Sequence, residues 1–337
     1  MKKLNRLFDV KEDHVSQLVQ SPNYWALELW EKGCANNWMP QTIDMSQDIE
    51  QWRDKALLTD DERLIVKRTL GLFSAGESLV SNSITEAESK YITDGACKQY
   101  MLRKAFEESL HNYTVKMCVE AYGLDVNEVA EAYLNIPTIS KKEKFLSAVL
   151  GKFEDPSFDI TTTEGIQLFT KNLFVIYLIC EGIWFFPNFA LIMSLGRQNK
   201  LIGLYDQIKY TIRDETLHVE FGVKLINQIA VEYPEIWTPE FKDELIELMK
   251  VGVEIEKEYS KEILPNGILG VNSDMLNTYV EFLANERLAS VNLKYKFPSD
   301  KNPFPFLGET QDGDGMAAFF ERREKNYRNA SVLEDDL

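Results

Sequence analysis

The chain has 337 residues, of which 45% are hydrophobic and 12% aromatic, so it can bury one large core and is not typical of a disordered protein. Its formal net charge of -17 argues against a nucleic-acid or anionic-membrane surface, because phosphate contacts need clustered Lys and Arg. The four cysteines have neither disulfide-framework nor metal-type spacing, and without a signal peptide they predict a reduced cytoplasmic protein: Cys34, Cys97, Cys118 and Cys180.

Helical patterns dominate the chain, and no segment shows the alternating pattern of a strand. Thr59 and Glu62 have the spacing of a capping box, which predicts a helix over 59–87. A second helix is predicted over 93–122, where Gly123 supplies a typical C-terminal stop. Further along, we expect a short helix near 127–134, a loop at 151–163, and helices over about 173–195, 200–231, 239–264 and 273–288.

The segment 173–195 is apolar almost throughout and is long enough to cross a bilayer. It also contains Glu181, Pro187 and Asn188, and an isolated carboxylate in lipid is costly. We therefore expect no membrane span here. A helix that is apolar on all faces is instead typical of the centre of a bundle, surrounded by other helices.

Residues from Phe297 onward are rich in Pro, Gly, Asp and Asn and read as an extended tail with few apolar anchors. The sequence thus predicts one helical domain over 1–296 and a flexible C-terminal tail over 297–337.

Two of the three histidines lie in the same short motif, Glu-x-x-His, at Glu108–His111 and again at Glu215–His218. Positions i and i+3 are neighbours on one helix face, so each motif can present a carboxylate and an imidazole to one ion. A single motif is weak evidence, because a solvated helix face beside a core histidine has the same pattern. Two such motifs on two long helices favour a carboxylate-bridged dimetal bundle, which takes one further Glu from each of two other helices.

Glu77 and Glu181 stand where those two further carboxylates are needed, each on the helix that precedes a motif helix. Four ionised carboxylates balance two divalent cations, and without metal they would repel one another. The alternative for Glu181 is a buried carboxylate paired with Lys or Arg, but no basic residue lies near it in the sequence.

Six longer motifs are spread over nearly the whole chain: CANNWMP (34–40), AGESLVSNSI (75–84), AFEESLH (105–111), CEGIWFF (180–186), RQNKLIG (197–203) and RDETLH (213–218). Together, and in this order, they resemble the small subunit of class I ribonucleotide reductases. The resemblance implies an all-α, ferritin-like helical bundle with a dimetal-carboxylate site. It also implies a homodimer that works with a large (alpha) subunit, which reduces ribonucleotides to deoxyribonucleotides. The metal ligands it implies are those that spacing selects: Glu77, Glu108, His111, Glu181, Glu215 and His218.

The same resemblance implies a radical-transfer route. Trp38 matches the family tryptophan that passes an electron toward the metals, and Asp214 matches the aspartate that links this tryptophan to the ligand His111. Tyr327 matches the tail tyrosine that relays the radical to the large subunit. Each residue also has a simpler interpretation. Trp38 could be a core residue, Asp214 could only anchor a ligand histidine, and Tyr327 could be an exposed tail residue. Only the joint occurrence of the three favours the route.

Two positions depart from the common family pattern. Glu77 stands where most members have Asp, and Val115 stands where most carry a radical-storing tyrosine. Tyr113 is close by, but it lies about 200° round the helix from His111 and should point away from the metals. The pattern resembles the subgroup in which a high-valent manganese-containing cluster stores the oxidising equivalent. Manganese plus iron is favoured, dimanganese comes second, diiron is least favoured, and an activating flavoprotein is left open.

Two other functions use related scaffolds. A ligand-binding manganese/iron oxidase also has Glu at the first ligand position, but it does not need Trp38, Asp214 and Tyr327 together. A ferritin-type storage protein needs a shell-forming subunit that is usually nearer half this length. Ribonucleotide reduction that depends on a matching large subunit would distinguish the reductase from both.

Overall fold

The computed structural model describes residues 7–8, 18–19, 21–151 and 158–311, which form helices and loops with no β-strand. The chain divides into two units, Met1–Pro303 and Phe304–Leu337, and the described part of the second unit contains the short helix α14. The helices are α1 (Tyr24–Ala35), η1 (Pro40–Thr42), α2 (Ser46–Arg53), α3 (Asp60–Asn82), η2 (Ser83–Glu88), α4 (Ser89–Tyr91), α5 (Gly95–Tyr122), α6 (Val126–Ala130), α7 (Ala132–Asn135), α8 (Pro137–Leu150), α9 (Thr163–Leu173), η4 (Phe174–Trp184), α10 (Phe185–Gly196), α11 (Ile202–Glu232), η5 (Pro234–Ile236), α12 (Pro239–Ile263), α13 (Ser273–Ser290) and α14 (Phe306–Gln311).

Local capping fixes the ends of α3 and α5, the helices that carry Glu77 and the first Glu-x-x-His motif. The predicted capping box at the start of α3 is present: the Glu62 amide donates to Thr59 Oγ1 at 3.2 Å, and the Thr59 amide donates to Glu62 Oε2 at 2.9 Å. Asp94 caps α5 by accepting a hydrogen bond from the Cys97 amide. The predicted stop at Gly123 is also confirmed, with a left-handed φ of 63° that glycine adopts without strain.

Several elements differ from the expectation. The helix predicted over 59–87 changes at Ser83 into a π-helix, η2, and the one predicted near 127–134 divides into α6 and α7. The helices α1, α2 and α8 were not predicted at all. For α8 the reason is its composition. It contains the charged run Lys141, Lys142 and Glu143, and it has few buried apolar residues, such as Ile139 and Leu146, so its apolar periodicity is weak.

The apolar segment forms the centre of the bundle, as predicted. A continuous helix runs through α9, η4 and α10 (Thr163–Gly196), and it is long and apolar enough to cross a membrane, yet its apolar window is wholly buried inside the structure. Its neighbours are α11, α12 and α13, so protein rather than lipid surrounds it. The middle part, η4, is a π-helix that contains Glu181, and π-helical turns are frequent at functional sites.

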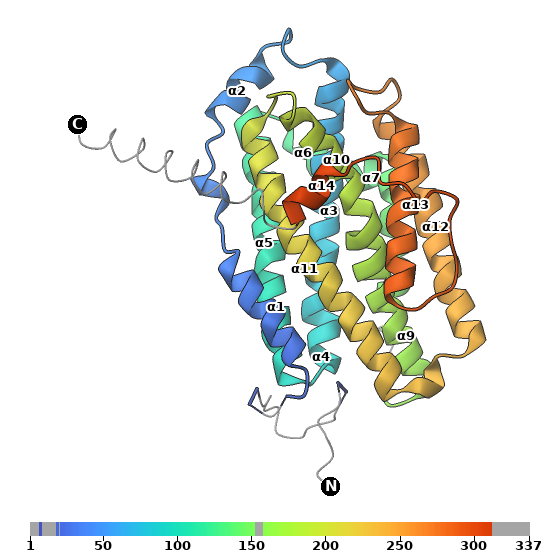
Figure 1. Ribbon diagram of the computed structural model, residues 1–337. Coiled ribbons are helices and arrows are strands. Elements are labelled where there is room, and N and C mark those ends of the chain that lie inside the picture. The colour runs from blue at the N-terminus through green and yellow to red at the C-terminus, as the bar shows by residue number, and fades with distance from the viewer. Residues whose placement is uncertain (1–6, 9–17, 20, 152–157, 312–337) are drawn as a thin grey trace, which may run out of the picture. The chain divides into compact units, whose positions relative to one another are not determined.

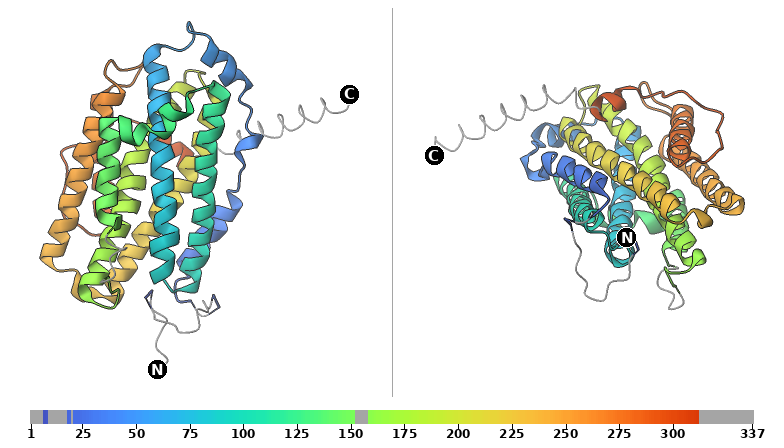
Figure 2. Two further views of the ribbon diagram at one scale, coloured as in Figure 1. Left: turned by 180° about the vertical axis from the view of Figure 1, so that it is seen from behind. Right: turned by 60° about the horizontal axis from the view of Figure 1, so that its bottom comes forward.

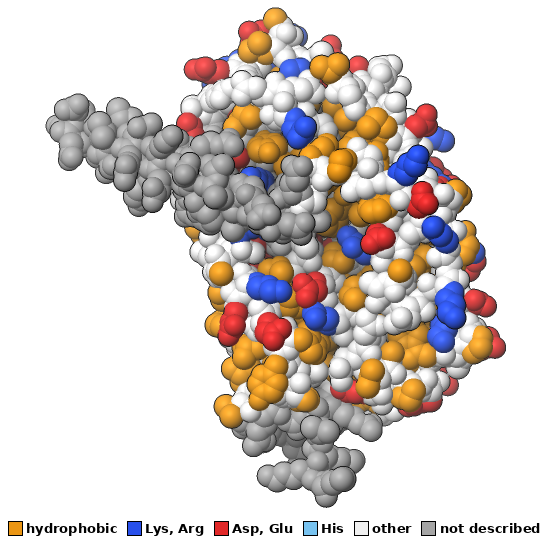
Figure 3. Space-filling view, viewed as in Figure 1, with side chains coloured by type: hydrophobic (Ala, Val, Ile, Leu, Met, Phe, Trp, Pro, Cys, Tyr) orange, Lys and Arg blue, Asp and Glu red, His pale blue; other side chains and the backbone are white. Residues whose placement is uncertain are grey.

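Two pairs of long helices position the candidate site. α3 packs beside α5, and η4 with α10 packs beside α11, while α5 also contacts α11 (Figures 1 and 2). Gly222 on α11 allows a close approach to η4, because a Cβ there would lie 2.2 Å from the side chain of Tyr177. On the face seen in Figure 3, acidic, basic and apolar side chains are interspersed, and the described residues form no broad basic area there.

Candidate metal centre

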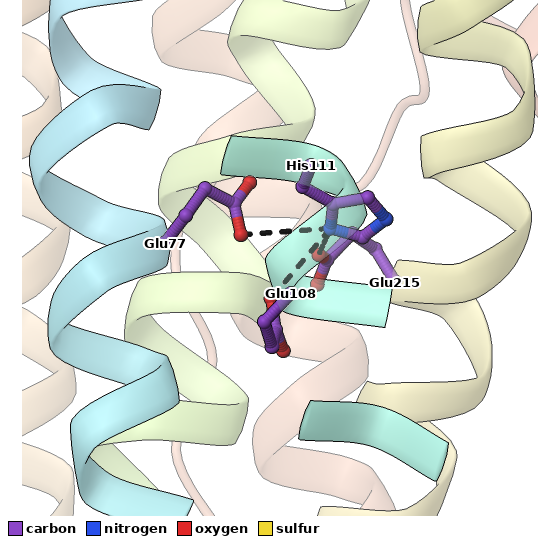
Figure 4. Close-up of side chains that lie close together, drawn as sticks. All are labelled: Glu77, Glu108, His111 and Glu215. Carbon is purple, nitrogen blue, oxygen red and sulfur yellow. Dashed lines mark ion pairs between the residues drawn. The ribbon is translucent and has the colours of Figure 1, made fainter. Parts of the chain in front are cut away.

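The six side chains predicted to bind metal converge inside the bundle from four helices, and each is at most 2% exposed. Figure 4 shows four of them facing one another between α3, α5 and α11. The helix of origin is α3 for Glu77, α5 for Glu108 and His111, η4 for Glu181, and α11 for Glu215 and His218.

The six residues form two overlapping groups that could each hold an ion. The first sub-site comprises Glu77, Glu108, His111 and Glu215, and the second comprises Glu108, Glu181 and His218; within each, the ligand atoms lie within 4.8 Å of one another. Glu108 and Glu215 face both groups. Glu108 Oε2 lies 3.6 Å from His111 Nδ1, and Glu108 Oε1 lies 3.2 Å from His218 Nδ1. Glu215 Oε1 and Oε2 lie 3.2 and 3.4 Å from the same two nitrogens. Both carboxylates would therefore be available to two ions, and the ligand set is the one that dimetal bundles use.

The donor atoms of the cluster lack the hydrogen bonds that buried polar atoms normally make. Within the described part of the chain, no hydrogen bond reaches Glu77 Oε2, Glu181 Oε2, either carboxylate oxygen of Glu215, or the Nδ1 atoms of His111 and His218. The lone pairs of these oxygen and nitrogen atoms point toward one another with no hydrogen-bond donor between them, and a bound cation would satisfy them. The residues present therefore fit two metal ions.

Each histidine is held from its other side by a carboxylate. His111 Nε2 lies 3.3 Å from Asp214 Oδ2, and His218 Nε2 lies 2.9 Å from Glu107 Oε2. The Arg103 side chain in turn donates from Nε to Glu107 Oε1 at 2.7 Å. Such contacts orient a metal-binding imidazole and set its tautomer, so both Nδ1 atoms are directed at the centre. Glu107 was not predicted, although its place beside Glu108 in the sequence is a usable signal.

The predicted link from Trp38 to the cluster is present as a chain of contacts. Trp38 is 1% exposed, and its indole Nε1 donates to Asp214 Oδ2 at 2.8 Å, the same oxygen that faces His111. The ring of Tyr210 stacks on Trp38 with centroids 5.0 Å apart and planes at 7°. Tyr210 was not predicted to belong to this site, since it lies one turn before Asp214 and no motif marks it.

The ion pair that the sequence argued against is present. Lys104 on α5 is buried, and its ammonium donates to Glu181 Oε1 at 2.6 Å and lies 2.9 Å from Glu108 Oε1. The expectation failed because it considered only neighbours of Glu181 in the sequence, whereas Lys104 comes from another helix. The i, i+4 spacing of Lys104 and Glu108 was the available signal.

The pKa shifts of the cluster differ between its carboxylates. Burial alone would raise the pKa of Glu108 and of Glu215, but Lys104 and His218 lower the first and His218 lowers the second. Burial raises the pKa of Glu181 to about 8, although the Lys104 ammonium opposes this shift. Burial also raises the pKa of Glu77 well above its usual range. Burial alone would lower the pKa of His111 and of His218, but the surrounding carboxylates raise both well above the usual value. Two divalent ions would supply positive charge to the cluster.

Three positions concern where a radical could be stored or relayed. Tyr113 points away from the cluster, as expected, because it is 38% exposed and its ring lies 5.8 Å from Lys116 Nζ. Val115 is buried and places no phenol beside His111. Tyr327 lies outside the described residues.

The comparisons with known proteins agree on one family. The model of the family "Ribonucleotide reductase, small chain" matches residues 16–303. Ribonucleoside-diphosphate reductase subunit beta from Chlamydia pneumoniae is 42% identical over 327 residues, which are 97% of this chain and 94% of that protein. These matches favour the reductase over the oxidase and storage alternatives.

Solved structures give the same fold. The ribonucleotide reductase R2 subunit from Clostridium botulinum superposes with a TM-score of 0.82 at 23% identity, covering 91% of this chain and 94% of that one. A putative class I ribonucleotide reductase from Bacillus halodurans gives a TM-score of 0.76 at 26% identity, covering 85% and 99%. The predicted ferritin-like fold is confirmed, and the chain belongs to the ribonucleotide reductase small chain family.

Proposed function

We propose that the six clustered side chains bind two metal ions, and that the chain generates the radical with which the large subunit of a ribonucleoside-diphosphate reductase reduces ribonucleotides to deoxyribonucleotides. The observation that carries the proposal is the pair of Glu-x-x-His motifs facing Glu77 and Glu181, with both Nδ1 atoms directed inward. Family membership supports the role of small subunit, and small subunits in general work as dimers with a large subunit.

The bound ions would supply a one-electron oxidant inside the bundle. Trp38 would pass an electron toward it, because its indole N–H is held by Asp214, which also faces His111. Asp214 accepts both contacts on one oxygen, so it fixes the tryptophan relative to the ligand histidine. Tyr327 would continue the route at the interface with the large subunit, and a tail over 297–337 would dock there.

We propose a centre of the subgroup that stores its oxidising equivalent on the metals rather than on tyrosine. Val115 and Glu77 support this assignment, since Val115 offers no oxidisable ring at the position of the family's radical tyrosine. Manganese plus iron is the first choice and dimanganese the second. Anomalous scattering at the manganese and iron edges, on protein loaded with both metals, tests the choice. The cytoplasm is the proposed compartment, and an activating flavoprotein is a further candidate partner.

Reconstitution with the matching large subunit tests the function. Metal-loaded chain plus large subunit should convert ribonucleoside diphosphates to deoxyribonucleoside diphosphates, and neither protein should do so alone. Metal-free chain plus large subunit is the control. Equal turnover with and without metal would contradict the proposed function.

A further inference from the structure

A lysine ammonium lies inside the carboxylate cluster, on the side of the second sub-site. Lys104 Nζ is 2.6 Å from Glu181 Oε1 and 2.9 Å from Glu108 Oε1. That same oxygen of Glu108 is only 3.2 Å from His218 Nδ1, the nitrogen of the second sub-site. The ammonium therefore shares two carboxylates with the position where a metal ion would bind.

In the first sub-site, Lys104 contacts only the shared Glu108, whereas in the second it contacts both carboxylates, Glu108 and Glu181. At the first sub-site, the ion-pair contacts of Glu77 are to His111, and those of Glu215 are to His111 and His218, whose imidazoles are themselves candidate ligands. The two sub-sites thus resemble each other in ligand type but differ in permanent charge.

Lys104 is confined to this position by its surroundings. Its side chain is 0% exposed, and its ammonium lies 4.8 Å from the centroid of the Tyr177 ring. The Tyr177 hydroxyl is in turn held by Glu88, to which it donates at 2.5 Å. Since a buried ammonium needs anionic partners, Lys104 stays beside Glu108 and Glu181 rather than turning to solvent.

We propose that Lys104 competes with the metal ion of the second sub-site for Glu108 and Glu181, so that the first sub-site fills first and the second binds more weakly. This inference rests on the proposed two-metal centre. Four carboxylates carry -4; with Lys104 and one divalent ion the sum is -1, and the second ion brings it to +1. Without the lysine, the same steps give -2 and then 0. The lysine thus reduces the negative charge that meets each ion by one unit. It opposes the ion of the second sub-site more because it lies nearer to that ion, in contact with both Glu108 and Glu181.

Such a difference would let two sub-sites with nearly the same ligands take different metals. An ion at the first sub-site meets carboxylates that are not shared with an ammonium, except for Glu108. An ion at the second sub-site finds Glu181 Oε1 occupied by Lys104 and only Oε2 free, so an ion that binds carboxylate and imidazole more strongly would be retained there in preference to a weaker one. Lys104 is thus a positioning residue for metal loading.

The test is a titration of the metal-free full-length protein with Mn²⁺ alone, following free Mn²⁺ by electron paramagnetic resonance and heat by calorimetry. Lys104→Met removes the charge and the hydrogen bond, and Lys104→Gln removes the charge but keeps a donor. Lys142→Met is the matched control, because Lys142 is also a buried lysine in an ion pair, 2.5 Å from Glu256, and its ammonium lies over the rings of Trp184 and Tyr259 rather than beside His111 or His218. Circular dichroism checks that each variant is folded.

We expect wild-type protein to bind its second Mn²⁺ at least tenfold more weakly than its first. Both Lys104 variants should tighten the second step at least tenfold and leave the first within a factor of about three, while Lys142→Met changes neither. A second step that is unchanged or weaker in folded Lys104→Met would overturn the inference. A different failure, no Mn²⁺ bound by wild type or by any variant, would instead contradict the proposed metal centre.

Discussion

Metal binding should stabilise the fold by an amount that reveals how many ions are bound. An ion at 100 times its dissociation constant stabilises the native state by about 2.7 kcal/mol, so two ions contribute about 5.4 kcal/mol. The entropy of unfolding is about 2.1 cal/mol/K per residue, or about 0.7 kcal/mol/K for 337 residues. Saturation with two ions should therefore raise the melting temperature by about 8 °C.

The perturbation that tests the ligand set is Glu181→Ala. Glu181 is buried and supplies a carboxylate to the second sub-site, so its removal should abolish binding of at least one ion. The metal-dependent rise in melting temperature should then be at most about 4 °C. Metal content by mass spectrometry should fall from two ions per chain to one or none.

Glu256→Ala is the matched control. Glu256 is also buried and also pairs with a buried lysine, Lys142, at 2.5 Å. Loss of a carboxylate partner from a buried ion pair costs about 3–5 kcal/mol, so Glu256→Ala should melt about 4–7 °C lower than wild type without metal. Glu181→Ala should melt less far below wild type, because Lys104 keeps Glu108 as its partner. Only Glu181→Ala should also lose half or more of the metal-dependent rise. If the Glu181→Ala protein binds two ions and calorimetry shows the full metal-dependent rise of about 8 °C in its melting temperature, the assignment of Glu181 as a ligand is refuted.

Three further predictions concern the oxidant and its route. Active protein should lack a tyrosyl signal in electron paramagnetic resonance, because Val115 replaces the radical tyrosine. Tyr113→Phe should keep most of its activity, because Tyr113 points away from the cluster. A tyrosyl signal that is present in wild type and disappears in Tyr113→Phe would contradict this. Asp214→Ala should fold but lose about 10–100-fold in turnover or metal affinity, because both Trp38 and the ligand His111 lose their contact with the carboxylate. Unchanged steady-state kinetics and metal content would exclude Asp214 as the link between Trp38 and His111. Tyr327→Phe should assemble the metal centre and bind the large subunit yet fail to turn over, and near-normal turnover would remove this residue from the route.

The features predicted from the sequence were those that short-range chemistry specifies. The capping box at Thr59 and the stop at Gly123 depend on residues within one helical turn. The Glu-x-x-His motifs likewise depend on the i, i+3 geometry of a single helix. The central helix was predicted because an apolar surface on all sides requires surrounding protein.

The features that were missed depend on contacts between distant segments. Lys104 and Glu181 are 77 positions apart, and the stacking of Tyr210 on Trp38 joins α11 to a loop near the N-terminus. The π-helical turns of η2 and η4 were missed for a related reason. A π turn inserts a residue where packing against neighbouring helices demands it, and the apolar sequence of η4 gives no periodic signal that distinguishes it from an α-helix.

The bundle's apolar core also explains why the cluster should bind metal strongly. Burial of η4 and α10 among other helices fixes the backbone on which Glu181 is carried, so the carboxylates cannot separate to relieve their repulsion. Desolvation raises the pKa of Glu181 to about 8 even though Lys104 is within hydrogen-bond distance, which indicates that one ammonium does not compensate the buried charge. Packing elsewhere in the bundle therefore holds the ligands in an arrangement that is unfavourable without cations. Binding of two divalent ions would release that unfavourable energy, because it replaces protons and repulsion with metal–ligand bonds, and metal affinity and fold stability would then be linked.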